Sequence, residues 1–201
     1  SGSNFNNYLH LLRYTGTGLV NRPGWPVPVN QGYFLAVGDI DNDGSPEVVT
    51  TGWRNQKVYA FKLNGQAVPG FPLILPNAFQ LTAGPVLVDV DNDEDLEIIV
   101  INFSSDNPTH DGEFYVIHHN GQVAEGYPKK SFNFVSHLPV LADIDNDGKP
   151  EIIATSFATG SPNAMLFAVN VEDGTSLPGF PYHIVDDEII FNPAVADVDG
   201  D

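Results

Sequence analysis

The chain has 201 residues and contains no cysteine and only 8 lysines and arginines. The absence of cysteine excludes disulfides, thiolate metal sites and a cysteine nucleophile. Because the 26 acidic residues far outnumber the 8 basic ones, the formal charge is −18. Such a chain repels phosphate backbones and anionic lipid headgroups, so neither nucleic acid nor a membrane surface is an expected partner.

Long apolar runs and helical patterns are also missing. No stretch approaches the roughly 20 apolar residues that a membrane-spanning helix needs, and none combines a helical period with capping residues. No nucleophile elbow, phosphate loop or dinucleotide fingerprint is present. The 19 glycines and 16 prolines favour short strands joined by turns.

The chain does contain an acidic motif that recurs. Its complete copies are called loop one (39–47), loop two (89–97) and loop three (143–151), and a fourth copy begins at Asp197. The starts lie 50, 54 and 54 residues apart, and the four segments hold 17 of the 26 acidic residues. A paired Val or Ile follows each complete loop.

A second marker keeps the same period. A glycine, an aromatic residue and a proline recur at 24–26, 70–72, 126–128 and 179–181. The last three copies each follow a turn dipeptide, Asn64-Gly65, Asn120-Gly121 or Asp173-Gly174, of the kind that favours hairpins. Two markers at one period of about 50 residues indicate a solenoid, a propeller or an array.

Within one unit the pattern predicts four strands. In the first complete unit they are expected at 34–40, 47–53, 58–63 and 66–73. The predicted class is all-β, and four-stranded units of this length repeated radially form a β-propeller. A β-sandwich is the alternative, but it does not predict identical loops at a constant period.

The ends of the chain are out of phase with the units. Residues 8–14 and 19–27 resemble third and fourth strands, and the last residues resemble a first strand without a second. We expect one propeller that closes on itself or, because that second strand is missing, a part of a larger propeller. The expected divisions are a partial blade at about 4–30, blades at about 31–80, 81–134 and 135–190, and a partial blade at about 191–201.

The acidic loops have the chemistry of a metal site. Carboxylates at positions 1, 3, 5 and 9 and the carbonyl at position 7 offer hard oxygen ligands, which select calcium or magnesium over zinc. An EF-hand would need glutamate at position 12, where Thr50, Val100 and Ala154 stand. A solvated turn without an ion is the alternative, although clustered carboxylates then repel one another.

We expect about three Ca²⁺ sites and a fourth, incomplete one, mainly with a structural role, because ion binding to the folded state stabilises it. Glycine at position 6 permits a sharp turn, so Glu94 in loop two predicts strain or a weaker site. The predicted ligands are Asp39, Asp41, Asp43, Ser45, Glu47, Asp89, Asp91, Asp93, Asp95, Glu97, Asp143, Asp145, Asp147, Lys149, Glu151, Asp197, Asp199 and Asp201.

The motif Asp-x-Asp-x-Asp-Gly-x-x-Glu followed by paired Val or Ile resembles the FG-GAP (VCBS-type) repeat of integrin α-subunit propellers and of many bacterial surface and secreted proteins. The resemblance covers residues 8–201. It implies a calcium-binding β-propeller that serves in binding or adhesion, is often joined to further blades or domains, and lies outside the cell. The absence of disulfides suggests a microbial source.

A ligand surface is expected opposite the acidic loops, where the second and third strands of each blade are joined by loops of varying length. An aromatic residue lies six positions after each position-9 glutamate, although these rings could instead pack between blades. The histidines show no repeat spacing, so lone surface or strand positions are expected. The candidate ligand residues are Trp53, Phe103, Asp106, Asn107, His110 and Phe157.

Together these features predict a non-catalytic, lectin-like recognition or adhesion module of a secreted or cell-surface protein, which binds carbohydrate or an extracellular protein. Two alternatives remain open. One is an accessory or catalytic propeller of a secreted polysaccharide lyase or hydrolase, although no carboxylate pair is recognisable outside the loops. The other is a scaffold without a ligand.

Overall fold

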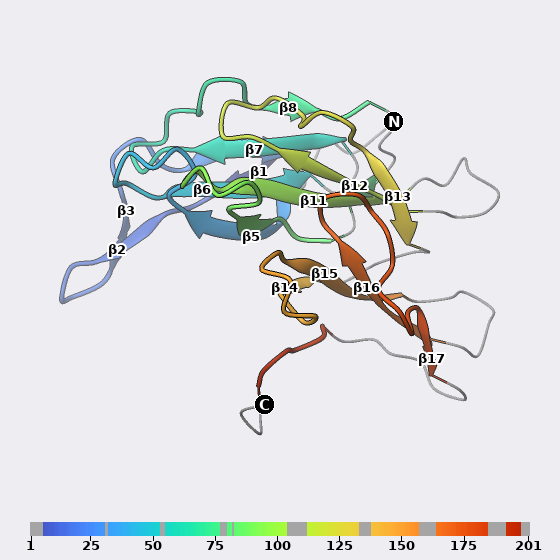
Figure 1. The fold of residues 1–201 in the computed structure, drawn as a ribbon. Helices are drawn as coiled ribbons and strands as arrows, with labels where there is room; N and C mark the ends of the chain where they lie inside the picture. Colours follow the sequence, from blue (N-terminus) through green and yellow to red (C-terminus); the bar gives the residue numbers. More distant parts are fainter. Residues whose placement is uncertain are drawn as a thin grey trace, which may run out of the picture.

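The computed structural model describes residues 6–30, 32–52, 55–76, 80–81, 83–103, 112–132, 138–156, 164–184 and 192–197. Within these ranges all regular structure is β-strand (Figure 1). Over the same ranges no helix could cross a membrane. The all-β class predicted from the sequence is confirmed.

Three antiparallel sheets hold the three repeat units, each with its strands in chain order. The second sheet carries one additional strand, β9, beside β11. The strands are β5 (Gly32–Gly38), β6 (Glu47–Gly52), β7 (Lys57–Phe61) and β8 (Leu73–Ile74); β9 (Gln80–Leu81), β10 (Val86–Val88), β11 (Glu97–Phe103), β12 (Gly112–Ile117) and β13 (Lys129–Phe132); and β14 (Val140–Ala142), β15 (Glu151–Ser156), β16 (Ala164–Asn170) and β17 (Tyr182–Ile184).

The fourth strand of each unit lies later than predicted. Before Pro72, among residues 66–71, only Ala67 forms a bridge, to Phe61, and a turn with Phe71 N donating to Val68 O (3.0 Å) follows. The ladder resumes at β8, after Pro72, whose nitrogen has no hydrogen to donate. The other two units repeat this arrangement, so the prediction of a continuous fourth strand before the proline was wrong.

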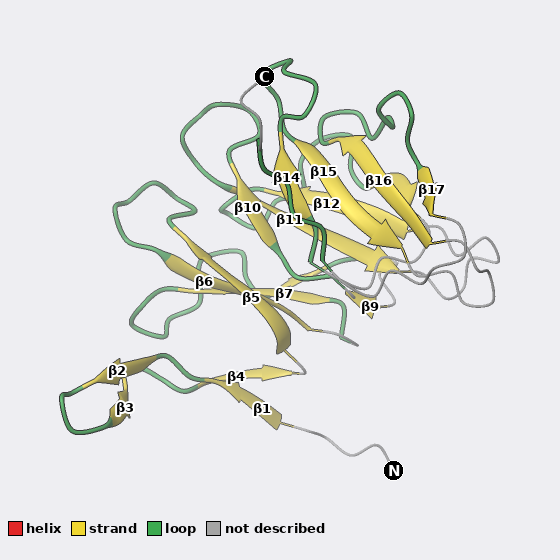
Figure 2. Cartoon of the chain, turned by 90° about the horizontal axis from the view of Figure 1, so that it is seen from below, coloured by secondary structure: helices red, strands yellow, loops and turns green. Residues whose placement is uncertain are grey.

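The N-terminal residues form a broken hairpin, not the two continuous strands that were predicted. β1 (Asn6–Leu9) pairs with β4 (Val27–Asn30), and β2 (Leu12–Tyr14) pairs with β3 (Leu19–Asn21). Between the two ladders, Arg22 N donates to Leu11 O (2.8 Å). The hairpin lies beside the first sheet (Figure 2).

Apolar clusters fill the spaces between successive sheets. In β6, Val48 packs with Trp25 and Tyr59 against the N-terminal hairpin, whereas the next residue, Val49, packs with Ile98 of the second sheet. Neighbouring residues of β11 and β15 divide between clusters in the same way. Burial on both faces explains the continuous Val and Ile runs after each acidic loop.

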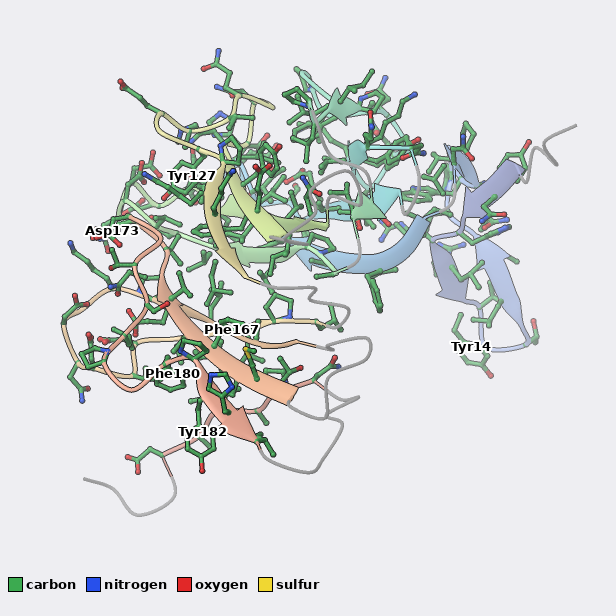
Figure 3. The ribbon with its side chains drawn as sticks, turned by 90° about the vertical axis from the view of Figure 1, so that its right-hand side faces the viewer. Tyr14, Tyr127, Phe167, Asp173, Phe180 and Tyr182 are labelled. Carbon is green, nitrogen blue, oxygen red and sulfur yellow. The ribbon has the colours of Figure 1, made fainter. Side chains whose placement is uncertain are left out.

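The aromatic residues of the first three Gly-aromatic-Pro segments, Trp25, Phe71 and Tyr127, pack toward the following sheet. Trp25 Nε1 donates to Leu63 O (2.9 Å), and Tyr127 Oη donates to Val171 O. A methyl group added at Gly70 would lie 1.9 Å from Asn120 O, so no side chain fits there. Tyr127 lies beside the third-sheet hairpin that contains Asp173 (Figure 3).

The first strands of the units converge. β10 contacts both β5 and β14. Phe34, Gly84, Leu138 and Asn192 occupy the same position, five residues before an acidic motif. A methyl group at Gly84 would lie 2.8 Å from Phe34 Cβ and 2.1 Å from Leu138 Cδ2, and Leu138 N donates to Asn192 Oδ1 (3.0 Å). The equivalent residues of successive units therefore lie next to each other, each beside its counterpart in the next unit. Residues 192–197 take part in this arrangement although they form no strand.

Candidate metal centre

The three acidic loops share one backbone arrangement, which the position-1 aspartate holds. Asp39 accepts hydrogen bonds from the amides of Asp43 and Gly44 at 3.0 and 2.8 Å. Asp89 accepts the same pair of bonds at 3.2 and 3.2 Å, and Asp143 at 3.1 and 3.0 Å. Each loop therefore folds around a carboxylate supplied at the end of a first strand.

Positions 4 and 6 have left-handed backbone conformations. Asparagine, which tolerates this region, stands at position 4 with φ between 50° and 63° in the three loops. At position 6, Gly44 and Gly148 have φ of 87° and 90°, but Glu94 has φ of 76°. The strain predicted for loop two is confirmed, because glutamate lacks the conformational freedom of glycine.

The position-9 glutamates open the second strands and are buried, with 0% exposure for Glu47 and Glu151 and 1% for Glu97. In each, Oε2 accepts a hydrogen bond from the amide at position 2, at 3.1 Å in loop one, 2.9 Å in loop three and 3.0 Å in loop two. The second oxygen, Oε1, differs between the loops: in Glu97 it lies 3.1 Å from His118 Nδ1. Among the described residues, Oε1 of Glu47 and Oε1 of Glu151 have no hydrogen-bond partner.

The predicted carboxylates gather around these positions. Within each group that follows, one ligand atom per residue lies within 4.8 Å of those of the others. Such proximity fits a divalent cation, since oxygen donors without one repel each other. The groups are Asp39, Asp41 and Asp43; Asp89, Asp91 and Asp93; Asp91, Glu97 and His118; and Asp143, Asp145 and Glu151.

Burial raises the pKa of Glu47 and of Glu151 above the ordinary value, and nearby aspartates raise it further. The amides of Ile40 and Ile144 oppose this rise by donating to the two carboxylates. The ionised glutamates therefore raise the free energy of the ion-free fold at neutral pH. A bound cation would remove this cost, so the residues present fit a hard divalent metal.

The three loops differ in the residue opposite the position-9 glutamate. In loop one this residue is Lys62, one place beyond the Val48–Phe61 pair of β6 and β7. Its Nζ lies 3.1 Å from Asp41 Oδ2, 2.9 Å from Asp43 Oδ2 and 3.8 Å from Glu47 Oε1. Hydrogen bonds to Asp43 and Asp41 raise the pKa of Lys62, which stays charged.

In loop two the equivalent residue is His118. Its Nδ1 lies 3.1 Å from Glu97 Oε1, while Nδ1 of the next residue, His119, lies 2.7 Å from Asp95 Oδ2. Asp91, Glu97 and His118 border a cavity of about 420 Å³. Loop two thus combines carboxylates with an imidazole nitrogen beside a cavity.

In loop three the equivalent residue is Asn170, which pairs with Glu151 across β15 and β16. Its Nδ2 donates to Thr175 Oγ1 (3.0 Å) and not to the glutamate. Lys149, at position 7, forms an ion pair with Glu172 (2.6 Å). The carboxylates of loop three therefore face a neutral residue.

Sequence reasoning missed Lys62, and it treated His118 and His119 as lone surface or strand residues. Contact with acidic loop residues corrects that interpretation for the two histidines. A signal was present in the sequence: Lys62 and His118 each stand three residues before the glycine of a hairpin turn. Antiparallel pairing places that position opposite the position-9 glutamate.

Several predicted sites remain untested. Asp199 and Asp201 lie outside the described residues, so the fourth loop is not defined beyond Asp197. The backbone carbonyls at position 7, those of Ser45, Asp95 and Lys149, stay predictions as metal ligands.

The candidate ligand residues lie almost entirely outside the described ranges. Phe103 ends β11, and only its place in that strand is described. The structure therefore does not test the expected ligand surface. The candidates outside the described residues are Trp53, Asp106, Asn107, His110 and Phe157.

Comparison with known families agrees with the geometry of the loops. The sequence model of the FG-GAP-like repeat matches residues 39–100 and 89–154. Each match begins at the first aspartate of one loop and ends in the second strand of the following unit, β11 for the first match and β15 for the second. No curated protein and no solved structure matches the chain. The matches cover more than half of the 201 residues, and the chain belongs to the FG-GAP-like repeat family.

Proposed function

We propose that this chain is a calcium-stabilised β-propeller region of an extracellular recognition or adhesion protein. The observation that carries the proposal is Oε1 of Glu151, which is buried without a hydrogen-bond partner in the described part of the chain and is grouped with Asp143 and Asp145. Only oxygen atoms meet there, and such donor sets favour calcium or magnesium.

Two features support a propeller. The first and second sheets are buried on both faces by their neighbours, as the blades of a propeller are. Their first strands meet at Phe34, Gly84 and Leu138, which hold equivalent places in three units. Within the part of the chain that the structure describes, one face of the third sheet, around Ile153 and Leu177, carries a small cluster made of its own residues. A further unit would complete this cluster.

The protein's own residues prepare each loop for the ion. The position-1 aspartate orders the backbone, and the position-9 glutamate joins the loop to the second strand through the position-2 amide. A bound cation would supply the positive charge that the remaining carboxylate oxygens lack. Its binding free energy would then stabilise the blade.

The recognition role rests on the family, whose repeats are typical of extracellular proteins. We assign the ligand to the loops between second and third strands, with Trp53, Phe103 and Phe157 as candidate contacts for a carbohydrate or an extracellular protein. The role requires no catalytic group.

A glycan and matrix-protein array, run with calcium and with EGTA, tests the recognition role. It should show calcium-dependent binding, and no binding to any spot would contradict this part of the proposal.

Calcium binding itself is tested by flow dialysis of the whole chain. The wild type should bind calcium, and Asp145→Asn should lose one site because it removes a carboxylate beside Glu151. Asp173→Asn removes a carboxylate outside the loops and serves as the control, which should keep every site. Equal binding by Asp145→Asn and the wild type would contradict the assignment of loop three.

A further inference from the structure

We propose that Lys62 is the built-in cation of loop one, occupying the place among its carboxylates that a calcium ion takes in loop three. The inference rests on the proposed function, because it distinguishes loops that share one calcium motif. Loop one is partly neutralised by the protein's own ammonium group, whereas the carboxylates of loop three rely on a metal ion for positive charge.

The position of the Lys62 ammonium carries the argument. Nζ lies within 4 Å of a carboxylate oxygen from each of positions 3, 5 and 9 of loop one, at 3.1, 2.9 and 3.8 Å. These are side chains predicted to ligate the ion. The Lys62 side chain is 33% exposed and the Glu47 side chain 1% exposed, so the ammonium reaches from the surface to a buried carboxylate.

Loop three offers the natural comparison. It has the same four acidic positions as loop one, but Asn170 replaces the lysine at the cross-strand position. The amide of Asn170 donates to Thr175, and among the described residues Oε1 of Glu151 has neither a hydrogen-bond partner nor an ion pair. Oε1 of Glu47 also lacks a hydrogen-bond partner, but it has the Lys62 ammonium at 3.8 Å. Two loops with equal acidic charge therefore differ by one internal positive charge.

This difference determines what a calcium ion must do at each loop. At loop three, among the described residues, no ammonium group forms an ion pair with the loop carboxylates, and Lys149 pairs with Glu172 instead. At loop one the calcium ion must displace an ammonium that already interacts with Asp41 and Asp43, and it repels that ammonium at close range. Calcium should therefore bind loop one more weakly, and loop one should keep its shape without metal.

The test is calcium titration of the ¹⁵N-labelled chain by NMR. The amides of Gly44 and Gly148 report on loops one and three, since they donate to Asp39 and Asp143. In the wild type the midpoint at Gly44 should lie at least about tenfold above that at Gly148, which corresponds to about 1.4 kcal/mol. In Lys62→Met the Gly44 midpoint should fall to within about threefold of that at Gly148.

Lys149→Met is the matched control. It removes the same charge beside loop three, but the Lys149 ammonium forms its ion pair with Glu172, and the substitution keeps the position-7 carbonyl. The wild-type order of midpoints should therefore persist. The double variant Lys62→Met with Asp41→Asn should bind calcium at loop one more weakly than Lys62→Met alone, so its Gly44 midpoint should rise again. That result would assign the tighter binding of Lys62→Met to loop one.

Each result separates the inference from the proposed function. Equal midpoints at Gly44 and Gly148 in the wild type, or an unchanged Gly44 midpoint in Lys62→Met, would overturn the role of Lys62 and leave calcium binding intact. No calcium response at either amide in any variant would overturn both. Should Lys62→Met be unfolded in EGTA, recovery of its fold by calcium would support the inference, and failure to recover would contradict it.

Discussion

A single residue distinguishes the backbone of loop two from its two counterparts. Glu94 has φ of 76°, where loops one and three have glycine. Left-handed backbone costs a residue with a β-carbon about 1 to 2 kcal/mol. One compensating contact is present, since Asn42 Nδ2 donates to Glu94 Oε2 (3.2 Å) on the exposed surface.

We therefore expect Glu94→Gly to raise the free energy of unfolding by about 1 kcal/mol, because relief of strain exceeds the loss of one exposed hydrogen bond. Urea unfolding of the chain measures the change. Glu94→Ala is the control: it loses the same carboxylate but keeps a β-carbon, so it should not stabilise. Equal stabilisation by alanine would show that charge, not backbone strain, is responsible.

At the scale of elements, the hairpin turn after β16 differs from its counterparts in one charge. Asp173 Oδ1 accepts hydrogen bonds from Thr175 N (2.8 Å) and Thr175 Oγ1 (2.7 Å), where the other turns use Asn64 and Asn120. The Thr175 hydroxyl and amide lower the pKa of Asp173 below its ordinary value. The ionised form therefore stabilises the turn at neutral pH.

This stabilisation should be lost as the pH falls below about 4 and Asp173 takes up a proton, since its folded pKa lies below its unfolded one. Asp173→Asn keeps the acceptor oxygen without a titrating group. We expect the wild type to exceed the variant by less than about 1 kcal/mol near neutral pH, since the turn is exposed, and to lose that advantage near pH 3. Urea unfolding at both pH values checks this, and a constant difference would contradict it.

The contact between the second and third sheets involves the Tyr127 hydroxyl, which donates to Val171 O. Burial and, to a smaller extent, the negative charges of Glu172 and Asp173 raise the pKa of Tyr127 to about 12. The hydroxyl therefore remains a donor at neutral pH. Tyr127→Phe should lower the free energy of unfolding by about 1 kcal/mol. Tyr14→Phe, on the exposed N-terminal hairpin, is the control and should change little. Equal losses in both variants would argue against a role in joining the sheets.

At the scale of the whole molecule, the convergence of the first strands at Gly84 holds the sheets together. Gly84→Ala would place a methyl group 2.1 Å from Leu138 Cδ2 and 2.8 Å from Phe34 Cβ. Overpacking of this kind costs about 1 to 3 kcal/mol, which thermal unfolding would detect. Gly18 has open space around it, so Gly18→Ala should be nearly neutral. An unchanged unfolding temperature for Gly84→Ala would show that the strands do not meet there.

The features that were predictable from sequence are those that neighbouring residues encode. The acidic loops and the Asn-Gly turns depend on local backbone chemistry, and the paired Val and Ile residues indicate strands buried on both faces. The Lys62 contact with Glu47 depends on the register of β6 and β7, and the meeting of Phe34, Gly84 and Leu138 depends on the packing of three sheets. The fourth strands were misplaced because alternation before the prolines resembled a strand, whereas a turn interrupts it.

Ions bound in the acidic loops are proposed to stabilise the whole fold. Thermal unfolding of the complete chain, in excess calcium and in EGTA, measures this stabilisation directly. At about one hundred times the dissociation constant, calcium should raise the unfolding temperature by about 5 °C or more. An unfolding temperature that is the same in calcium and in EGTA would contradict the account.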